Sequence, residues 1–190
     1  DDAEYYKYKK WGALNPPAGY ASSGQTKSGK YNFVNPVALE KDVDPLPDHH
    51  DGPTELQPDA TYPFLFGNFR IYHHEHSSTF NNYQLMKRVG TNPLWLNKMD
   101  AHDLGIEEGD RVRLRSPWGK TEMVAHPTWE IMPGSLGSGG GFGHTRGLEG
   151  DPKFPQFGGT NPPGIQKPNT TEDMGGTPLF KYIKARVEKV

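Results

Sequence analysis

The stretch that decides the fold covers residues 92–119 and reads NPLWLNKMDAHDLGIEEGDRVRLRSPWG. The apolar residues 94–96 predict a short buried strand. Asn97 is well suited to cap a helical turn, and Gly105 is suited to end it, because glycine readily adopts the left-handed conformation that follows a helix. The first half of the stretch therefore predicts a strand followed directly by a short helix.

The second half of this stretch predicts a β-hairpin. Residues 111–116 alternate arginine with apolar residues, which is the pattern of a half-buried strand. Residues 117–120 form a turn, and residues 121–125 return as the hairpin partner. Other elements are expected on both sides: a strand at 62–66, a short helix within 80–89, a glycine-rich loop over 134–147, mostly loop over 148–178, and a final strand around Ile183, Ala185 and Val187.

The composition fits a loop-rich β protein and excludes several kinds of site. With 23 Gly and 18 Pro in 190 residues and a mean hydropathy of -0.82, the chain is lean for a domain that folds without outside support. The net charge of -2 gives no bulk attraction for nucleic acid or an anionic membrane. The absence of cysteine excludes disulfides, thiolate zinc sites and iron–sulfur ligands within the chain. No apolar run approaches the roughly 20 residues that span a bilayer, and the start at Asp1 indicates a processed or excised polypeptide.

Residues 92–119 closely resemble the molybdopterin-dinucleotide-binding domain of the dimethyl sulfoxide reductase family. They contain, in the family's order, the Asn-Pro pair, a strand, the Asp-Ala helix start, Leu-Gly-Ile, Gly-Asp, the alternating strand and Ser-x-x-Gly. Three further segments resemble family segments: 62–79, the first strand and pterin-facing loop; 133–144, the later glycine-rich loop; and 176–181, the closing Thr-Pro segment. The implied fold is mainly β, a double-psi β-barrel with short helical insertions over 61–190, preceded by a long extended interdomain arm over 1–60.

The resemblance implies a role for the chain within a larger enzyme. It would be the C-terminal cofactor-binding portion of an oxidoreductase catalytic subunit that holds bis-(molybdopterin guanine dinucleotide) with Mo or W for two-electron oxygen- or sulfur-transfer chemistry. The metal ligand and any iron–sulfur cluster would come from other domains, so the chain alone is expected to be inactive, with no catalytic residue and no metal ligand of its own. The partners implied are the remaining domains of the same subunit and an iron–sulfur electron-transfer subunit. The histidine-rich loop after the first strand resembles the thiosulfate, polysulfide, tetrathionate and arsenate reductase branch, in which a periplasmic or cell-envelope location in a prokaryote is common; a cytoplasmic location is the alternative.

A pterin dinucleotide needs backbone N–H groups, close approach of the chain and a few fixed side-chain donors. The glycines of residues 134–147 suit the first two needs, and Ser135 and Ser138 among others add donors, although a glycine cluster alone also fits a mobile surface loop. By resemblance, Arg70 serves a phosphate or a pterin carbonyl. The predicted cofactor contacts are Asn68, Arg70, His76, Ser77, Thr79, Asn92, Asn97, Asp100, Gly141, Phe142, Gly143, His144, Asn161 and Lys181.

Several alternatives stay open at this point. His73, His74, Glu75 and His76 could form a zinc site, although on a strand His74 and His76 would face one way and His73 the other, and no second motif completes the site; His73 and His74 could equally be exposed polar residues.

Instead of contacting the cofactor, Asn97 and Asp100 could serve as turn and helix-cap residues, and Lys181 could be a solvent-exposed strand residue. The arginines at 111, 113 and 115 fit a solvated strand face. At the level of the whole chain, the alternatives are a separate small cofactor-binding subunit, or a cofactor-free barrel for assembly or histidine-mediated metal binding.

Overall fold

The computed structural model describes residues 32–46, 48, 52–76, 78–80, 82–143, 162–172, 175–179 and 181–190. The chain divides into two compact units, one containing helix α2 (Pro36–Glu40) and the other containing all the other elements that the structure describes. These are the 3-10 helices η2 (Thr54–Leu56) and η3 (Pro162–Ile165), the helices α3 (Tyr83–Arg88) and α4 (Lys98–Asp103), and the strands β1 (Phe64–Phe69), β2 (Leu94–Asn97), β3 (Arg111–Arg115), β4 (Lys120–Thr128), β5 (Ser135–Gly139) and β6 (Ile183–Lys189).

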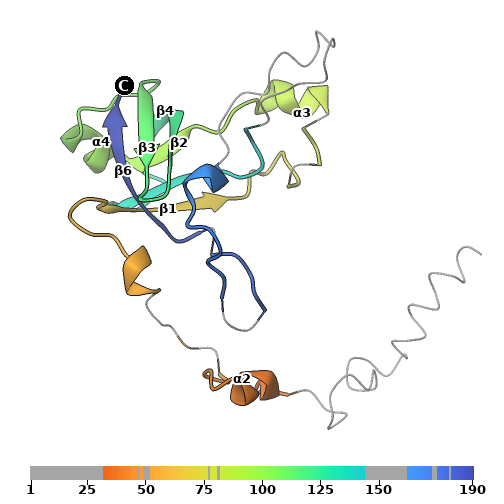
Figure 1. The fold of residues 1–190 in the computed structure, drawn as a ribbon. Coiled ribbons are helices and arrows are strands. Elements are labelled where there is room, and N and C mark those ends of the chain that lie inside the picture. The colour runs from red at the N-terminus through yellow and green to blue at the C-terminus, as the bar shows by residue number, and fades with distance from the viewer. Residues whose placement is uncertain are drawn as a thin grey trace, which may run out of the picture. The chain divides into compact units, whose positions relative to one another are not determined.

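The strands close into a barrel in the order β1-β5-β2-β4-β3-β6 (Figure 1). The pairs β1–β5 and β2–β4 are parallel, whereas β2–β5, β3–β4, β3–β6 and β1–β6 are antiparallel. Consequently β1 and β5 end at one end of the barrel, and β2 and β4 end at the other. The predicted mainly β barrel is confirmed.

The core of the barrel follows from the alternation of its strands. Every second residue of β3 and β6 is buried, including Val112, Leu114 and Ala185, because successive side chains of a strand point to opposite faces. Phe66 and Leu96 add large apolar side chains that are fully buried. The outward positions of β3 and β6 are therefore left to charged residues.

The predicted strand-helix unit after residue 92 is present. Asn97 is the last residue of β2 and caps α4, since its side-chain oxygen accepts a hydrogen bond from the Met99 N–H at 2.9 Å. Gly105 follows the helix with φ of 64°, as the C-terminal glycine signal predicts. The structure thus confirms the local chemistry read from this stretch.

The glycine-rich segment from residue 134 is not a loop throughout. Residues Ser135–Gly139 form β5, a strand between β1 and β2, which corrects the expectation of a loop over 134–147. The glycines are required by close packing: a Cβ on Gly137 would lie 3.0 Å from the Phe69 ring, and one on Gly139 would overlap the side chain of Ile71. Glycine here lets a strand approach bulky neighbours.

Helix α2 adds regular structure to the predicted N-terminal arm. Asn35 caps this helix, because its side chain accepts a hydrogen bond from the Val37 N–H at 3.0 Å. Within the described part of the chain, the helices are too short and too polar to cross a bilayer.

Candidate functional site

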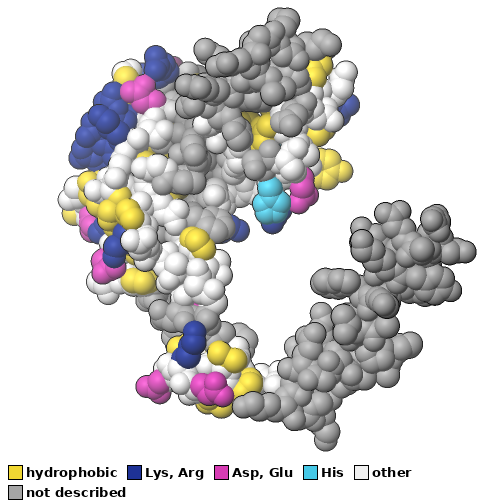
Figure 2. Space-filling view, turned by 45° about the vertical axis from the view of Figure 1, so that its right-hand side comes forward, with side chains coloured by type: hydrophobic (Ala, Val, Ile, Leu, Met, Phe, Trp, Pro, Cys, Tyr) yellow, Lys and Arg dark blue, Asp and Glu magenta, His cyan; other side chains and the backbone are white. Residues whose placement is uncertain are grey.

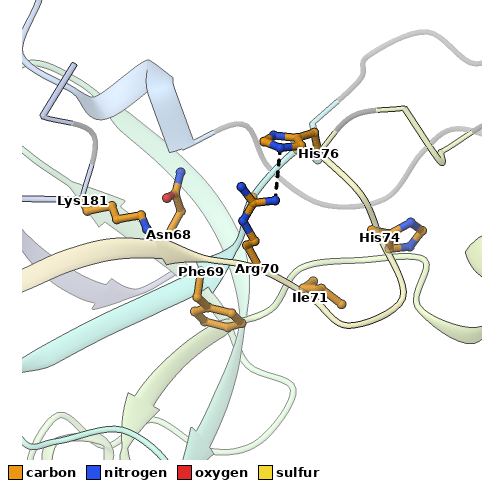
Figure 3. Close-up of a pocket in the computed structure, with 9 residues that line it drawn as sticks. Asn68, Phe69, Arg70, Ile71, His74, His76 and Lys181 are labelled. Atoms are coloured by element: carbon orange, nitrogen blue, oxygen red, sulfur yellow. Dashed lines mark hydrogen bonds between the residues drawn. The ribbon is translucent and has the colours of Figure 1, made fainter. Parts of the chain in front are cut away.

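A pocket of about 290 Å³ lies where β1 and β5 end (Figure 3). Its lining consists of residues from the end of β1, the segment that follows it, the glycines after β5, and the residue two positions before β6: Asn68, Phe69, Arg70, Ile71, His74, His76, Gly140, Gly141 and Lys181. This described lining includes two basic side chains, Arg70 and Lys181, and no carboxylate. The pocket therefore suits an anionic ligand with hydrogen-bond acceptors.

Strand alternation explains which side chains reach the pocket. Asn68 and Arg70 extend from one side of the chain at the end of β1, and Phe69 extends from the other (Figure 3). Phe69 packs against Trp95, with ring centroids 4.8 Å apart. The apolar residue thus anchors the strand, while its polar neighbours line the pocket.

Arg70 is tied to the segment that follows β1. Its Nη1 donates a hydrogen bond to Nε2 of His76 at 3.1 Å, which requires that this ring nitrogen carry no proton. The carboxylate of Glu75 lies 3.8 Å from the guanidinium and 3.6 Å from the imidazole. All three side chains are largely exposed, so a ligand can rearrange this group at little cost.

His74 also fixes the segment that follows β1. It is 8% exposed, its Nε2 donates to the carbonyl of Val89 at 2.7 Å, and its Nδ1 then accepts from the Thr79 hydroxyl at 3.1 Å. The ring stacks on Phe80 with centroids 4.5 Å apart. Both ring nitrogens are used, so His74 is a buried structural residue, which corrects the view that it is an exposed polar side chain.

The zinc alternative lacks a suitable geometry. The chain leaves the β conformation after Phe69, so His74 and His76 do not share a strand face, and Figure 3 shows His74 turned away from His76. The nearest basic neighbour of His76 is the Arg70 guanidinium, whose charge opposes a bound cation. Among the described residues, no group of three His, Cys, Asp or Glu side chains is arranged to hold a metal ion.

The glycines after β5 allow the two loops to meet. Gly140 donates its N–H to the carbonyl of Phe69 at 3.0 Å. Gly141 has φ of 93°, and a Cβ there would lie 2.5 Å from the carbonyl oxygen of His76. Only glycine permits this approach without a shift of the backbone, so the glycine-rich segment forms one wall of the pocket.

Comparison with known proteins agrees with this geometry. The family model described as the molydopterin dinucleotide binding domain matches residues 64–183. The chain belongs to this family. The matched range contains β1 to β5 in full and, of β6, its first residue, Ile183.

Two curated relatives of this molydopterin dinucleotide binding domain show the same kinship. The dimethyl sulfoxide reductase DmsA of Escherichia coli is 32% identical over 101 residues, which are 52% of this chain and 12% of that protein. The alpha subunit of a formate dehydrogenase of Methanococcus maripaludis is 30% identical over 107 residues, which are 55% of this chain and 15% of that protein. The chain is therefore short compared with both relatives.

A solved structure shows the same fold. The acetylene hydratase of Pelobacter acetylenicus aligns with a TM-score of 0.69 and 20% identity, over 87% of this chain and 24% of that chain. Family membership confirms the predicted cofactor class, a molybdopterin guanine dinucleotide with Mo or W.

A buried polar group supports the fit of such a cofactor independently of the sequence comparisons. Ser138 is 0% exposed, and its Oγ has no hydrogen-bond partner within the described part of the chain. It pairs in register with Asn68 and lies on the same face of β5 as the core residue Leu136. A buried hydroxyl without a partner is costly, and a polar ligand at this end of the barrel would satisfy it.

The structure sorts the predicted contact residues of the molydopterin dinucleotide binding domain into groups. Asn68, Arg70, His76, Gly141 and Lys181 come together around the pocket. Thr79 and Phe142 are not among the residues that line the pocket. The hydroxyl of Thr79 is hydrogen-bonded to His74, and the ring of Phe142 packs on that of Phe80. Gly143 directly follows Phe142, with φ of 90°. Ser77, His144 and Asn161 lie outside the described residues.

Three other predicted contacts use their polar groups inside the fold. The amide of Asn92 donates to the carbonyl of Gly139 at 2.8 Å. The amide of Asn97 donates to the carbonyl of Ile131 at 2.7 Å. The carboxylate of Asp100 accepts the N–H of Gly134 at 2.8 Å.

Asn92 thus supports the end of β5 beside the pocket, whereas Asn97 and Asp100 lie where β2 ends. For all three, a direct contact with the cofactor stays a prediction.

Sequence reasoning missed some of the lining. Phe69, Ile71, His74 and Gly140 also border the pocket. Gly140 lies within the glycine cluster and could have been included on that ground. The burial of His74 had no signal in the sequence, because it depends on Val89, which is 15 residues further along the chain.

Proposed function

We propose that this chain is the C-terminal cofactor-binding portion of a molybdopterin oxidoreductase catalytic subunit. The observation that carries the proposal is the pocket at the end of β1 and β5, whose described lining has two cations and no carboxylate, with the hydroxyl of Ser138 nearby, unpartnered among the described residues. This end of the barrel offers what a large polar anion needs. Family membership gives the class of that anion.

The residues would divide the work of binding. Arg70 and Lys181 would hold anionic oxygens, since hydrogen bonds from charged donors are the stronger kind. Asn68 and Ser138 would donate to, or accept from, neutral heterocycle atoms. Gly140 and Gly141 would let the backbone approach the ligand closely. In the bound state His76 would exchange its hydrogen bond from Arg70 for one to the cofactor.

The bound group would supply a Mo or W centre that passes between oxidation states two electrons apart, which suits oxygen- or sulfur-transfer redox chemistry. This chain would position that group and exclude water from one side of it. Other domains of the same subunit would supply the metal ligand and any iron–sulfur cluster.

We further propose an iron–sulfur electron-transfer subunit as the partner and a periplasmic or cell-envelope location in a prokaryote. The assignment to the thiosulfate, polysulfide, tetrathionate and arsenate reductase branch also stays a prediction. The mismatch in length with the relatives supports the view that further domains complete the enzyme.

The first test is to purify the protein from its native host and to measure its intact mass, its Mo and W content and its pterin content. We expect a polypeptide several times longer than 190 residues that carries stoichiometric metal and pterin. A native protein of about the mass of this chain, 21.2 kDa, free of metal and pterin in every complex that it joins, would contradict the proposal.

A further inference from the structure

The outer face of β4, β3 and β6 carries rows of charged side chains across the three strands. In one row Arg113 lies directly opposite Glu122 on β4 and Glu188 on β6. Its guanidinium is 2.9 Å from the first carboxylate and 3.4 Å from the second. The hydrogen bond from Arg113 lowers the pKa of Glu122. This row alternates acid, base and acid, which is the favourable order for cross-strand neighbours.

The adjacent row on the same face has the opposite character. Arg115 lies directly opposite Lys120 on β4 and Arg186 on β6, so three cations stand side by side. Because neighbouring strands are about 4.8 Å apart, this cation row spans roughly 10 Å. On the face shown in Figure 2, Lys and Arg side chains gather at the left of the molecule.

The carboxylates around the cation row are too few to neutralise it. Glu188 lies within 4.0 Å of three guanidiniums, those of Arg113, Arg115 and Arg186. Lys120 makes no ion pair with any residue that the structure describes. The Nε of Arg115 is buried and lies 2.9 Å from a carboxylate oxygen of Glu188, and the Nε of Arg186 is buried without a hydrogen-bond partner among the described residues.

Other cations on these strands are compensated. Lys184 pairs with Asp59 at 2.8 Å, and Lys189 pairs with Asp110 at 2.6 Å. The excess of positive charge is therefore confined to the cation row, in a chain whose net charge is -2. Like charges directly opposite one another destabilise a sheet, and a sequence that breaks such a local rule without internal compensation commonly does so for function.

We infer that the cation row, Lys120, Arg115 and Arg186, is a docking surface for a cluster of carboxylates on a different subunit of the enzyme. Charge complementarity selects the occupant: among the described residues the two arginines of the row share one carboxylate, Glu188, and Lys120 has no ion pair, so carboxylates spaced along a protein surface would balance the row. A nucleic acid fits less well, because Glu122 and Glu188 in the adjacent row would repel a continuous phosphate backbone. A separate subunit is favoured because one relative is itself named as the alpha subunit of its enzyme.

The inference rests on the proposed function, and it can fail while that function stands. Carbodiimide joins a lysine amine directly to a carboxylate with which it is in contact. We expect treatment of the native holoenzyme complex, followed by mass spectrometry of its peptides, to show Lys120 joined to an Asp or Glu of a second subunit.

Three results would overturn the inference. These are cross-links from Lys120 only to the same polypeptide, no cross-link at Lys120 in a complex whose other lysines react, and a holoenzyme that contains one kind of subunit.

A double variant tests the energetics. In the full-length enzyme, Lys120→Gln with Arg115→Gln should weaken subunit association about tenfold or more at low salt and flatten its salt dependence. The melting temperature should change little, because relief of the repulsion within the cation row offsets the loss of the Arg115–Glu188 contact. The matched control is Lys87→Gln with Arg88→Gln, two exposed cations on α3. Unchanged association in the double variant would refute the proposed partner.

Metal and pterin content separates the two proposals. Both double variants should retain the metal and pterin content of the unaltered enzyme, since none of the four residues lines the pocket. An unaltered enzyme that contains no metal and no pterin would instead count against the proposed function.

Discussion

The two ends of the barrel use polar side chains in opposite ways. Where β2 ends, Asn97 and Asp100 direct their side-chain groups to backbone N–H and carbonyl groups of the same chain. Where β1 and β5 end, Ser138 is buried without a partner in the described chain, and Arg70 and Lys181 are exposed at the pocket.

Polar residues therefore stabilise the fold at one end, whereas at the other end they line a pocket. The difference teaches that the hydrogen-bond partner of a polar residue, more than its type, separates a structural role from a binding role.

The largest expected effect is at the pocket end. Replacing Arg70 and Lys181 together with Ala should lower cofactor retention about 100-fold or more, since a hydrogen bond to a charged group contributes roughly 1.5–3 kcal/mol. Metal and pterin per polypeptide, measured after dialysis of the full-length protein, report the loss. The pair Lys87→Ala and Arg88→Ala removes the same charge from α3 and should leave retention unchanged. Equal retention in the two double variants would mean that the pocket does not bind the cofactor.

A second substitution tests the opposite end. Asn97→Ala removes the cap of α4 and leaves the carbonyl of Ile131 without its amide donor. We expect a loss of about 1–3 kcal/mol in the free energy of unfolding, measured by urea denaturation, with unchanged pterin per folded protein. Lys98→Ala, at an exposed neighbouring position, is the control. If Asn97→Ala selectively lost cofactor at full stability, the contrast between the two ends would be wrong.

Ser138→Ala sharpens the comparison, because it should act differently in the two states. Without cofactor, removing a buried hydroxyl that lacks a partner should leave stability unchanged or raise it by about 1 kcal/mol. With cofactor, the same change should weaken retention several-fold. Melting temperatures of the cofactor-free and the cofactor-loaded protein should show these opposite effects of the substitution. Parallel losses in both states would show that the hydroxyl has a partner within the protein.

The smallest expected effect is on stability at low pH and comes from Asp59, shortly before β1. Asp59 accepts a hydrogen bond from Lys184 and two more from the N–H groups of Tyr62 and Thr61, and these bonds lower its pKa. A lowered folded-state pKa contributes stability that is present above the ordinary value of 3.8 and is lost as pH falls through the folded pKa. The difference in melting temperature between the native protein and Asp59→Asn should therefore be present at pH 7 and should shrink below pH 3.8.

Asp103→Asn is the control, because its carboxylate is exposed and contacts only the adjacent His102 among the described residues. A difference for Asp59→Asn that persisted unchanged into strong acid would show that the carboxylate charge is not responsible.

Much of the fold could be predicted from local signals. The alternation of residues 111–115, the cap at Asn97 and the glycine at 105 each depend on neighbours within a few positions, so their physical meaning is visible in the sequence. The glycine-rich segment was misjudged for the opposite reason. Its glycines admit the side chains of Phe69, the last residue of β1, and Ile71, just after that strand, both far away in sequence.

The sequence by itself determined the family, the strand pattern and the kinds of donor that a cofactor would meet, because these are properties of residue type and spacing. Only the tertiary structure decided which donors converge. It brought Asn68 and Lys181 to one pocket, buried His74 against Val89, and set Arg115 between two other cations. The physical reason is that closing the barrel fixes register between strands distant in the chain, and register determines which side chains become neighbours.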